Sequence, residues 1–180
     1  MKEFKPVILF ILKFLGVYIG LMLVYNLYLS AYAGTYPDPF TKQVAYWSVN
    51  VANFFGVSSS ASVDAFHPWV WIVTEGKRTS YLNEGCNAIS VILLYAAFIA
   101  AFSRSWKAPL IFIIIGTVVI QLMNVMRIFL LNYVFRFHPH YGKSMHDYFF
   151  PAVIYGTVFL FWMIWVSRFV LKTKLNVKNV

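Results

Sequence analysis

The sequence is short of charged residues. Only 12% of its 180 residues are charged, six of them acidic, whereas 61% are hydrophobic. A soluble globular domain is usually about 45 to 50% apolar, with about a quarter of its residues charged. The shortage of charge therefore excludes an ordinary soluble domain and predicts an integral membrane protein.

Cysteine is almost absent as well. Cys86 is the one cysteine, which excludes an intramolecular disulfide and a thiolate zinc cluster. The chain has no internal repeat, and no G-x-S-x-G, Walker A, H-E-x-x-H or dinucleotide-binding motif. No cofactor is predicted, and the free thiol remains to be explained.

The formal net charge of +9 raises the question of nucleic acid. Most of the basic residues flank apolar runs, and they do not form a patch with interleaved aromatic residues. Nucleic acid is therefore not expected as a partner, and membrane lipids are.

Four apolar runs are long enough to be transmembrane helices. They lie at about residues 7–29, 86–103, 109–131 and 148–170, and a spanning helix needs roughly 20 mostly apolar residues to cross ~30 Å of hydrocarbon. We predict an all-α integral membrane protein, with residues 1–180 forming a single polytopic domain.

The first run has a rival interpretation as a signal peptide. Lysines precede it, and "AYA" at 31–33 resembles a signal-peptidase site. The apolar part of a signal peptide is about 7 to 15 residues long. The run at 7–29 is longer, so an uncleaved helix is favoured.

The distribution of lysine and arginine predicts the orientation, because these residues are enriched in cytoplasmic flanks. With the amino terminus inside, the cytoplasmic segments hold eight basic residues and one acidic residue, and the outer segments hold six basic and five acidic residues. We therefore expect a multi-pass protein of the inner (plasma) membrane with both termini cytoplasmic.

The outer segment, residues 31–85, shows an amphipathic helix followed by a hairpin. Thr41 is a possible N-cap of the helix, and its predicted apolar stripe consists of Val44, Trp47, Val51 and Phe55. This helix is expected to lie along the outer membrane surface. "SSSAS" at 58–62 indicates a flexible polar link. "WVWIV" and "RTSYL" around "TEGK" predict a small β-hairpin that leads to Cys86.

Residues that can take part in chemistry are predicted at the outer ends of the spans. Cys86 begins the second span, and Arg127 lies 18 residues after Pro109, about 27 Å along the third helix. His146 and Asp147 stand at the outer entrance of the fourth span. We therefore expect these side chains at one membrane depth, on the extracytoplasmic side.

The residue types suit acyl transfer by cysteine. A helix amino terminus favours the thiolate of Cys86, and His146 can take the thiol proton and later protonate a leaving amine. Arg127 can bind a substrate carboxylate or stabilise an oxyanion. Catalytic roles are predicted for all three, although a lone cysteine in an apolar protein is most often a small buried hydrophobe.

Three further residues are candidates for binding or orienting the substrate. Asn124 shares a helix face with Arg127 and can orient the guanidinium, although helix packing would also explain it. Asp147 adjoins His146. Glu84 is close to Cys86, where a solvated loop charge is the simpler interpretation.

A metal site is the competing interpretation of "HPHYGKSMHD". This stretch offers His138, His140, His146 and Asp147 as nitrogen and oxygen donors. Their spacing matches no common zinc site. No metal is therefore predicted.

The order of these motifs resembles the exosortase and archaeosortase family of integral-membrane cysteine transpeptidases. The matching stretches are "EGCNA" at 84–88, "NVMRIFLLN" at 124–132 and "HD" at 146–147, and "TYPDPFT" at 35–41 resembles short exosortase-like proteins of the Bacteroidetes. The family pattern implies Cys86 as nucleophile, Arg127 as substrate or oxyanion group and His146 as base. Ala88 departs from it, because members commonly have glycine at this place, and the larger members have more spans.

The resemblance implies sorting of exported proteins. The substrates would carry a carboxy-terminal signal made of a short motif, an apolar helix and a basic tail. Cys86 would cleave near the outer membrane surface and form a thioester, and an amine of a lipid or surface glycan would resolve it. The alternative is a non-catalytic membrane subunit or assembly factor for surface export, in which Cys86 is merely packed.

Overall fold

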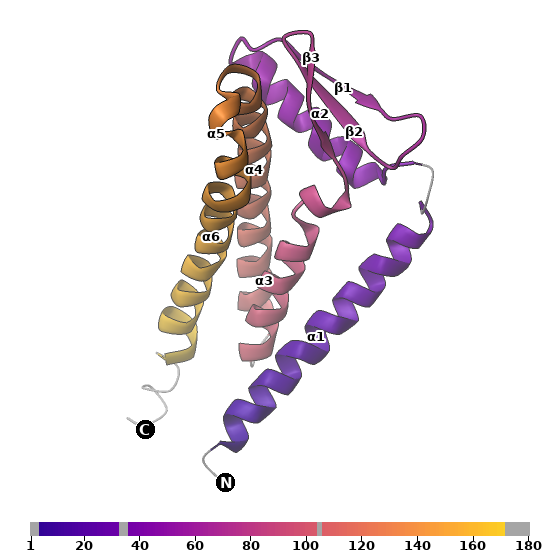
Figure 1. Ribbon diagram of the computed structural model, residues 1–180. Helices are drawn as coiled ribbons and strands as arrows, with labels where there is room; N and C mark the ends of the chain where they lie inside the picture. The colour runs from indigo at the N-terminus through magenta and orange to yellow at the C-terminus, as the bar shows by residue number, and fades with distance from the viewer. Residues whose placement is uncertain (1–3, 33–35, 104–105, 172–180) are drawn as a thin grey trace. The chain divides into compact units, whose positions relative to one another are not determined.

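The computed structural model describes residues 4–32, 36–103 and 106–171. The helices are α1 (Lys5–Ser30), α2 (Pro39–Phe54), α3 (Ile89–Phe102), α4 (Lys107–Phe137), α5 (Pro139–Ser144) and α6 (Phe150–Trp165) (Figure 1). The strands are β1 (Ser59–Val63), β2 (Val70–Thr74) and β3 (Lys77–Leu82). A 3₁₀ turn, η1 (Glu84–Cys86), and two π-helical segments, η2 (Met145–Phe149) and η3 (Val166–Leu171), complete the order.

The chain forms two compact units, and α1, α4 and α6 each run from one unit into the other. Unit 1 comprises Met1–Asn26, Ile89–Val119 and Tyr155–Val180, and unit 2 comprises Leu27–Ala88 and Ile120–Ile154. Every residue proposed for the site from the sequence belongs to unit 2.

Three of the described helical runs are long and apolar enough to cross a membrane. They are Val7–Ser30, Lys107–Phe137 and Pro139–Arg168, and they overlap the first, third and fourth predicted spans. The helix in the second predicted span, α3, has 14 residues and extends about 21 Å, less than the ~30 Å of hydrocarbon. The second predicted span, residues 86–103, therefore stays a prediction.

Unit 1 is held together mainly by apolar and aromatic side chains. Phe98 stacks on Trp162 with 4.2 Å between ring centroids, and the buried Tyr95 donates its hydroxyl hydrogen to the carbonyl of Phe112 at 2.7 Å. Gly116 contacts the Tyr95 ring so closely that a methyl group there would overlap it. α3 and α4 are therefore in close contact within this unit.

The run Pro139–Arg168 contains a π-turn just before Pro151. The N–H of Phe150 donates to the carbonyl of Met145, five residues earlier. Proline has no N–H to continue the α-helical ladder, and its ring crowds the carbonyl four residues before it. His146 and Asp147 lie in this wider turn, inside the helical run and not at its first residues. Their predicted place at the outer entrance of the membrane span stays a prediction.

Asp38, not Thr41, caps α2. The Asp38 carboxylate accepts hydrogen bonds from the backbone N–H groups of Phe40 and Thr41, both at 3.0 Å. Pro39 follows at the first helical position, where its fixed φ suits a helix start. The prediction of Thr41 as N-cap is therefore wrong by one turn, and Thr41 is instead fully buried.

The buried face of α2 also differs from the predicted stripe. The buried residues are Thr41, Val44, Ala45, Ser48, Val49 and Ala52. Trp47 is 39% exposed and Phe55 is 57% exposed. The face that packs on the sheet uses small side chains, which permit close approach, and the larger residues lie outside it.

The predicted hairpin is confirmed. β2 and β3 pair antiparallel through a two-residue turn in which Glu75 and Gly76 both have positive φ, 49° and 72°. Such turns match the twist of the flanking strands.

The predicted flexible link at 58–62 is wrong, because Ser59–Val63 forms β1. It pairs antiparallel with β2, with Ala61 opposite Ile72. Asn53 of α2 holds the start of this strand by accepting from Ser59 N at 2.8 Å and donating to Ser59 O at 3.1 Å. The polar composition of residues 58–62 does not itself specify a strand. Pairing with β2 and the hydrogen bonds of Asn53 order this segment.

The core of unit 2 joins α2, the sheet and α4. Its buried members are Val44, Ala45, Val49, Val70, Ile72, Leu82 and Ile128. Phe40, Ala61 and Cys86 pack against them from the edge. The thiol thus borders the core without being enclosed by it.

Candidate functional site

Cys86 ends a 3₁₀ turn that Asn83 organises. Asn83 Oδ1 accepts a hydrogen bond from Gly85 N at 3.1 Å, and its backbone carbonyl accepts from Cys86 N at 2.9 Å. α3 begins at Ile89, three residues after the cysteine. The prediction that Cys86 begins this helix is therefore wrong, and the turn itself positions the thiol.

Two fully buried asparagines fix this turn to neighbouring helices. Asn124 of α4 donates to the carbonyl oxygen of Cys86 at 2.9 Å. Asn87 donates to Thr41 Oγ1 of α2 at 3.0 Å. Because buried polar groups require partners, these bonds hold the backbone on both sides of the thiol in place.

Ala88 has an unusual backbone conformation. Its φ of 65° lies in the left-handed region, and the residue is only 7% exposed. This conformation favours glycine and costs another residue about 1 to 2 kcal/mol. Members of the family that the sequence resembles commonly have glycine at this place, and glycine would adopt this backbone without strain. Ala88 therefore differs from the family pattern at a strained position.

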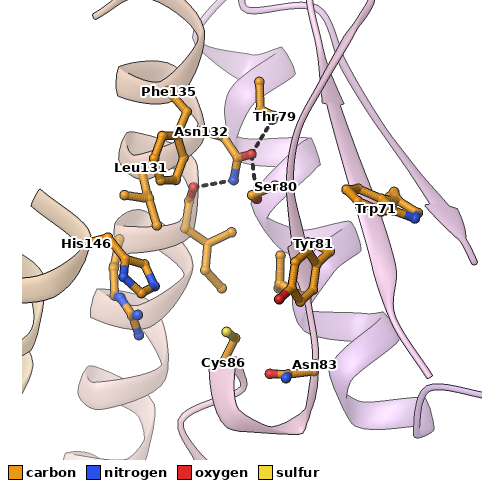
Figure 2. A pocket seen from close by; sticks show the side chains of 13 residues that line it. Trp71, Thr79, Ser80, Tyr81, Asn83, Cys86, Leu131, Asn132, Phe135 and His146 are labelled. Carbon is orange, nitrogen blue, oxygen red and sulfur yellow. Dashed lines mark hydrogen bonds between the residues drawn. The ribbon is translucent and has the colours of Figure 1, made fainter. Parts of the chain in front are cut away.

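Cys86, Arg127 and His146 border one cavity of about 540 Å³ in unit 2. Its other lining residues are Trp71, Thr79, Ser80, Tyr81, Leu82, Asn83, Ile128, Leu131, Asn132 and Phe135. Figure 2 shows the sulfur of Cys86 pointing into the space that has His146 on one side and Tyr81 on the other. The three residues predicted as catalytic, far apart in the sequence, are therefore brought to the same cavity.

His146 is paired with the residue that follows it. Its Nδ1 lies 2.7 Å from Asp147 Oδ1, and the two side chains are 47% and 38% exposed. An ionised carboxylate only accepts hydrogen bonds, so with Asp147 ionised and the imidazole neutral, the hydrogen of this bond belongs to Nδ1 and Nε2 carries a lone pair. That is the tautomer a general base requires, and within the described residues no hydrogen bond joins His146 to Cys86.

Arg127 lies well inside α4. The helix continues for ten residues beyond it, to Phe137, so the expectation of a position near the helix end is wrong. Its Nη1 lies 3.4 Å from Asn124 Oδ1, a long hydrogen bond, and the orienting role of Asn124 stays a prediction. In the part of the chain that the structure describes, Arg127 Nε is buried without a hydrogen-bond partner. The guanidinium therefore retains unused hydrogen-bonding capacity beside the cavity.

Glu84 lies apart from these groups. It is exposed, and it lines a different cavity of about 250 Å³ with residues of the α1–α2 connection such as Tyr36 and Asp38. The described residues contain no group of three or more His, Cys, Asp or Glu side chains that could hold a metal ion.

Sequence reasoning missed Asn132. It accepts from the hydroxyl groups of Thr79 and of Ser80, the latter at 2.9 Å, and donates to the carbonyl of Ile128 at 2.8 Å (Figure 2). Adjacent strand residues reach one acceptor because Thr79 is the extra residue of a β-bulge. The signal was a second asparagine on an apolar helix, two turns after Asn124.

Asn83 was missed as well. It borders the cavity beside Cys86 and holds the turn (Figure 2), and its signal was an N-capping residue type just before the "EGC" turn.

The arrangement contains the parts of a Cys/His acyl-transfer site, namely a thiol, an imidazole with a carboxylate partner and a guanidinium. Comparisons of the chain with protein-family models, with curated proteins and with solved structures find no match.

Proposed function

We propose that the protein is a membrane-embedded cysteine transpeptidase or protease of the exosortase and archaeosortase type. Its substrates are exported proteins that carry a carboxy-terminal apolar helix and a basic tail. The observation that carries this proposal is the cavity bordered by Cys86, Arg127 and His146, with Asp147 on the imidazole.

The first half of the reaction forms a thioester. His146 Nε2 takes the proton of the Cys86 thiol, and the sulfur attacks the scissile carbonyl carbon. Arg127 stabilises the oxyanion that develops, while Asp147 holds the imidazole and stabilises its charged form. The C–N bond then breaks, and His146 returns the proton to the departing amine of the tail fragment.

The second half releases the sorted protein. An acceptor amine, from a lipid or surface glycan, attacks the thioester while His146 takes its proton, and the sulfur leaves as thiolate. If water attacks instead, the same site performs proteolysis. Because the two outcomes share the thioester, the acceptor alone decides between transpeptidation and hydrolysis.

The proposed topology has four spans, both termini in the cytoplasm and the site on the extracytoplasmic side of the inner membrane. The excess of lysine and arginine in the segments assigned to the cytoplasm supports this orientation. The three long apolar helices support membrane spanning. Exported substrates carry their sorting signal to that side of the membrane.

The test is the processing of exported proteins that end in an apolar helix and a basic tail. In a host strain that expresses Cys86→Ala or Cys86→Ser at the wild-type protein level, these proteins should keep their tails, as detected by mass spectrometry. The serine variant keeps the shape of the side chain but has a much weaker nucleophile. Full processing in both strains would overturn the proposal.

The same experiment addresses a non-catalytic membrane subunit. The packing of Cys86 against the core of unit 2 favours that alternative. A subunit of this kind needs the volume of the side chain and not its nucleophilicity, so Cys86→Ser would leave export and processing intact.

A further inference from the structure

The open edge of the sheet faces the cavity. The strand order is β1–β2–β3, so β3 has one sheet neighbour within the described residues. Ser80, Tyr81 and Leu82 of β3 and the following Asn83 all border the cavity with Cys86. A strand at the edge of a sheet presents unpaired backbone N–H and C=O groups.

The cavity runs along this edge and not over one face of the sheet. Successive side chains of a strand point to opposite faces. Leu82 points into the core and is 2% exposed. Tyr81 points to the other face, where its ring stacks on Trp69 with 4.3 Å between centroids. A space that touches both residues must lie beside the backbone that joins them.

The two edges of the sheet are treated differently. At the β1 edge, the amide of Asn53 pairs with both the N–H and the C=O of Ser59. At the β3 edge, Asn132 binds only the side chains of Thr79 and Ser80 (Figure 2). In the described residues, the strand backbone from Ser80 to Leu82 bonds to β2 alone.

We propose that this cavity binds an extended peptide segment, which adds to β3 as a further strand. This inference rests on the proposed function and identifies how the substrate is held at the site. In the described residues the outer side of β3 has no strand partner, and an added strand can bond to its N–H and C=O groups at regular intervals. The edge leads through Asn83 to the turn of Cys86, so pairing along β3 brings a peptide carbonyl to the thiol. The cavity volume lies in the range of ligand-binding pockets.

Backbone pairing with β3 determines which features of a substrate the site recognises. Main-chain hydrogen bonds provide affinity for any sequence in an extended conformation, and side chains contribute only where they meet pockets. Here the cavity is lined by the aromatic Tyr81 of β3 and Trp71 of the neighbouring β2, and by Leu131 and Phe135 of α4. The scissile segment should therefore be extended, with apolar side chains accepted at alternate positions.

The experiment uses the full-length protein in lipid nanodiscs and thiol-reactive peptides. Acetylated tetrapeptide chloromethyl ketones of mixed sequence are compared with acetyl-glycine chloromethyl ketone, which has the same reactive group and no peptide extension. The chain has one cysteine, so alkylation detected by intact mass reports on Cys86. The fastest tetrapeptide is then made again with a methyl group on each backbone nitrogen in turn.

The expected result is an alternating pattern. Only every second residue of an added strand bonds to β3, so N-methylation at those positions should slow alkylation by about three- to tenfold, the equivalent of one hydrogen bond. Methylation between them should leave the rate unchanged. Equal rates at all positions, a loss without alternation, or no tetrapeptide faster than the glycine reference would overturn the proposal.

Failure here is distinguishable from failure of the proposed function. If Cys86→Ala abolishes processing but N-methylation shows no alternation, the enzyme assignment stands and strand addition is wrong. If processing survives in Cys86→Ala, the enzyme assignment is wrong, and a sorting substrate bound at β3 is wrong with it.

Discussion

The two units of the molecule differ in their buried polar side chains. Both contain aromatic ring contacts, such as Phe98–Trp162 in unit 1 and Trp69–Tyr81 in unit 2. All seven buried polar side chains identified in the described residues belong to unit 2, and they are Asp38, Thr41, Ser48, Thr74, Asn87, Asn124 and Asn132. Unit 1 is therefore suited to an apolar environment, and unit 2 uses hydrogen bonds to position backbone.

The difference shows where geometric precision is required. Aromatic packing is strong but tolerant in geometry, whereas a buried amide restricts its partners to a narrow range of distances and angles. Asn124 and Asn87 apply that restriction on either side of Cys86. The comparison predicts that changes in unit 2 alter activity, and that changes of equal size in unit 1 alter stability alone.

The largest effect should come from His146. His146→Ala removes the proposed base and should slow processing per folded molecule by about 10²- to 10⁴-fold. Asp147→Asn should also process substrates slowly. The asparagine amide can donate to Nδ1, which leaves the ring hydrogen on Nε2, the atom that has to accept the thiol proton. The rate of tail release, normalised to the amount of folded protein, measures both.

His140→Ala is the matched control, because this exposed histidine does not border the Cys86 cavity. It should process substrates at the wild-type rate. Equal losses in the His140 and His146 variants would show that the effect is not specific to the cavity.

Two glycines provide a comparison of intermediate size. A methyl group at Gly142 of α5 would overlap the ring of Phe135, which lines the cavity, whereas nothing lies within 4 Å of the corresponding position at Gly156 of α6. Gly142→Ala should lower the free energy of unfolding by about 1 to 3 kcal/mol and slow processing. Gly156→Ala should raise it by about 0.5 to 1 kcal/mol through helix propensity.

Unfolding in mixed detergent–SDS micelles measures both glycine variants. The comparison fails if the alanine at Gly142 is tolerated as well as the alanine at Gly156.

A smaller effect is expected at Ala88. Ala88→Gly relieves the strain of the positive φ. Glycine also gives the unfolded chain more conformational freedom, which offsets part of this gain. The net free energy of unfolding should rise by about 1 kcal/mol. Ala97→Gly, in the middle of α3 in unit 1, should lower it by about 1 kcal/mol. The same unfolding measurement applies, and a loss of stability in both variants would contradict the strained backbone at Ala88.

The smallest expected effect is the loss of stability at low pH through Asp64. The Trp71 indole, which donates to Asp64 at 2.6 Å, and then the Phe66 backbone N–H hold the pKa of Asp64 well below its usual range. The stabilising contribution is therefore complete above the unfolded-state pKa of about 3.9, and it is lost as the pH falls through the folded-state pKa. The described residues of unit 1 contain no carboxylate.

The difference in unfolding free energy between wild type and Asp64→Asn should shrink as the pH falls below about 4. The other carboxylates titrate in both proteins and cancel in this difference. A difference that grows as the pH falls below about 4 would contradict the depressed pKa.

Local patterns predicted part of the fold and missed another part for identifiable reasons. The apolar runs predicted the long helices, and "TEGK" predicted the hairpin, because length and turn chemistry are local properties. β1 was missed because "SSASV" becomes a strand only by pairing with β2. The face of α2 was misassigned because the sheet selected small residues over Trp47 and Phe55.

The candidate site shows the same division. Cys86, Arg127 and His146 were chosen as rare reactive or ionisable groups near the ends of apolar runs, a property that composition reveals. Asn83 and Asn132 have roles only through partners, so their polarity alone did not single them out. Helix ends were misplaced at Cys86 and His146, because a 3₁₀ turn and a π-turn interrupt the regular pattern there.

The sequence by itself determined that this chain is built around long apolar helices, and it singled out Cys86, Arg127 and His146 as candidates for chemistry. Apolar length and residue type are read directly from the chain. Only the tertiary structure decided that these three groups border one cavity, that two buried amides hold the turn of Cys86, and that the open edge of β3 lies beside it. The physical reason is that hydrogen bonds join residues far apart in the sequence, such as Thr41 with Asn87, 46 positions apart, and Ser80 with Asn132, 52 positions apart. No local pattern encodes those partners.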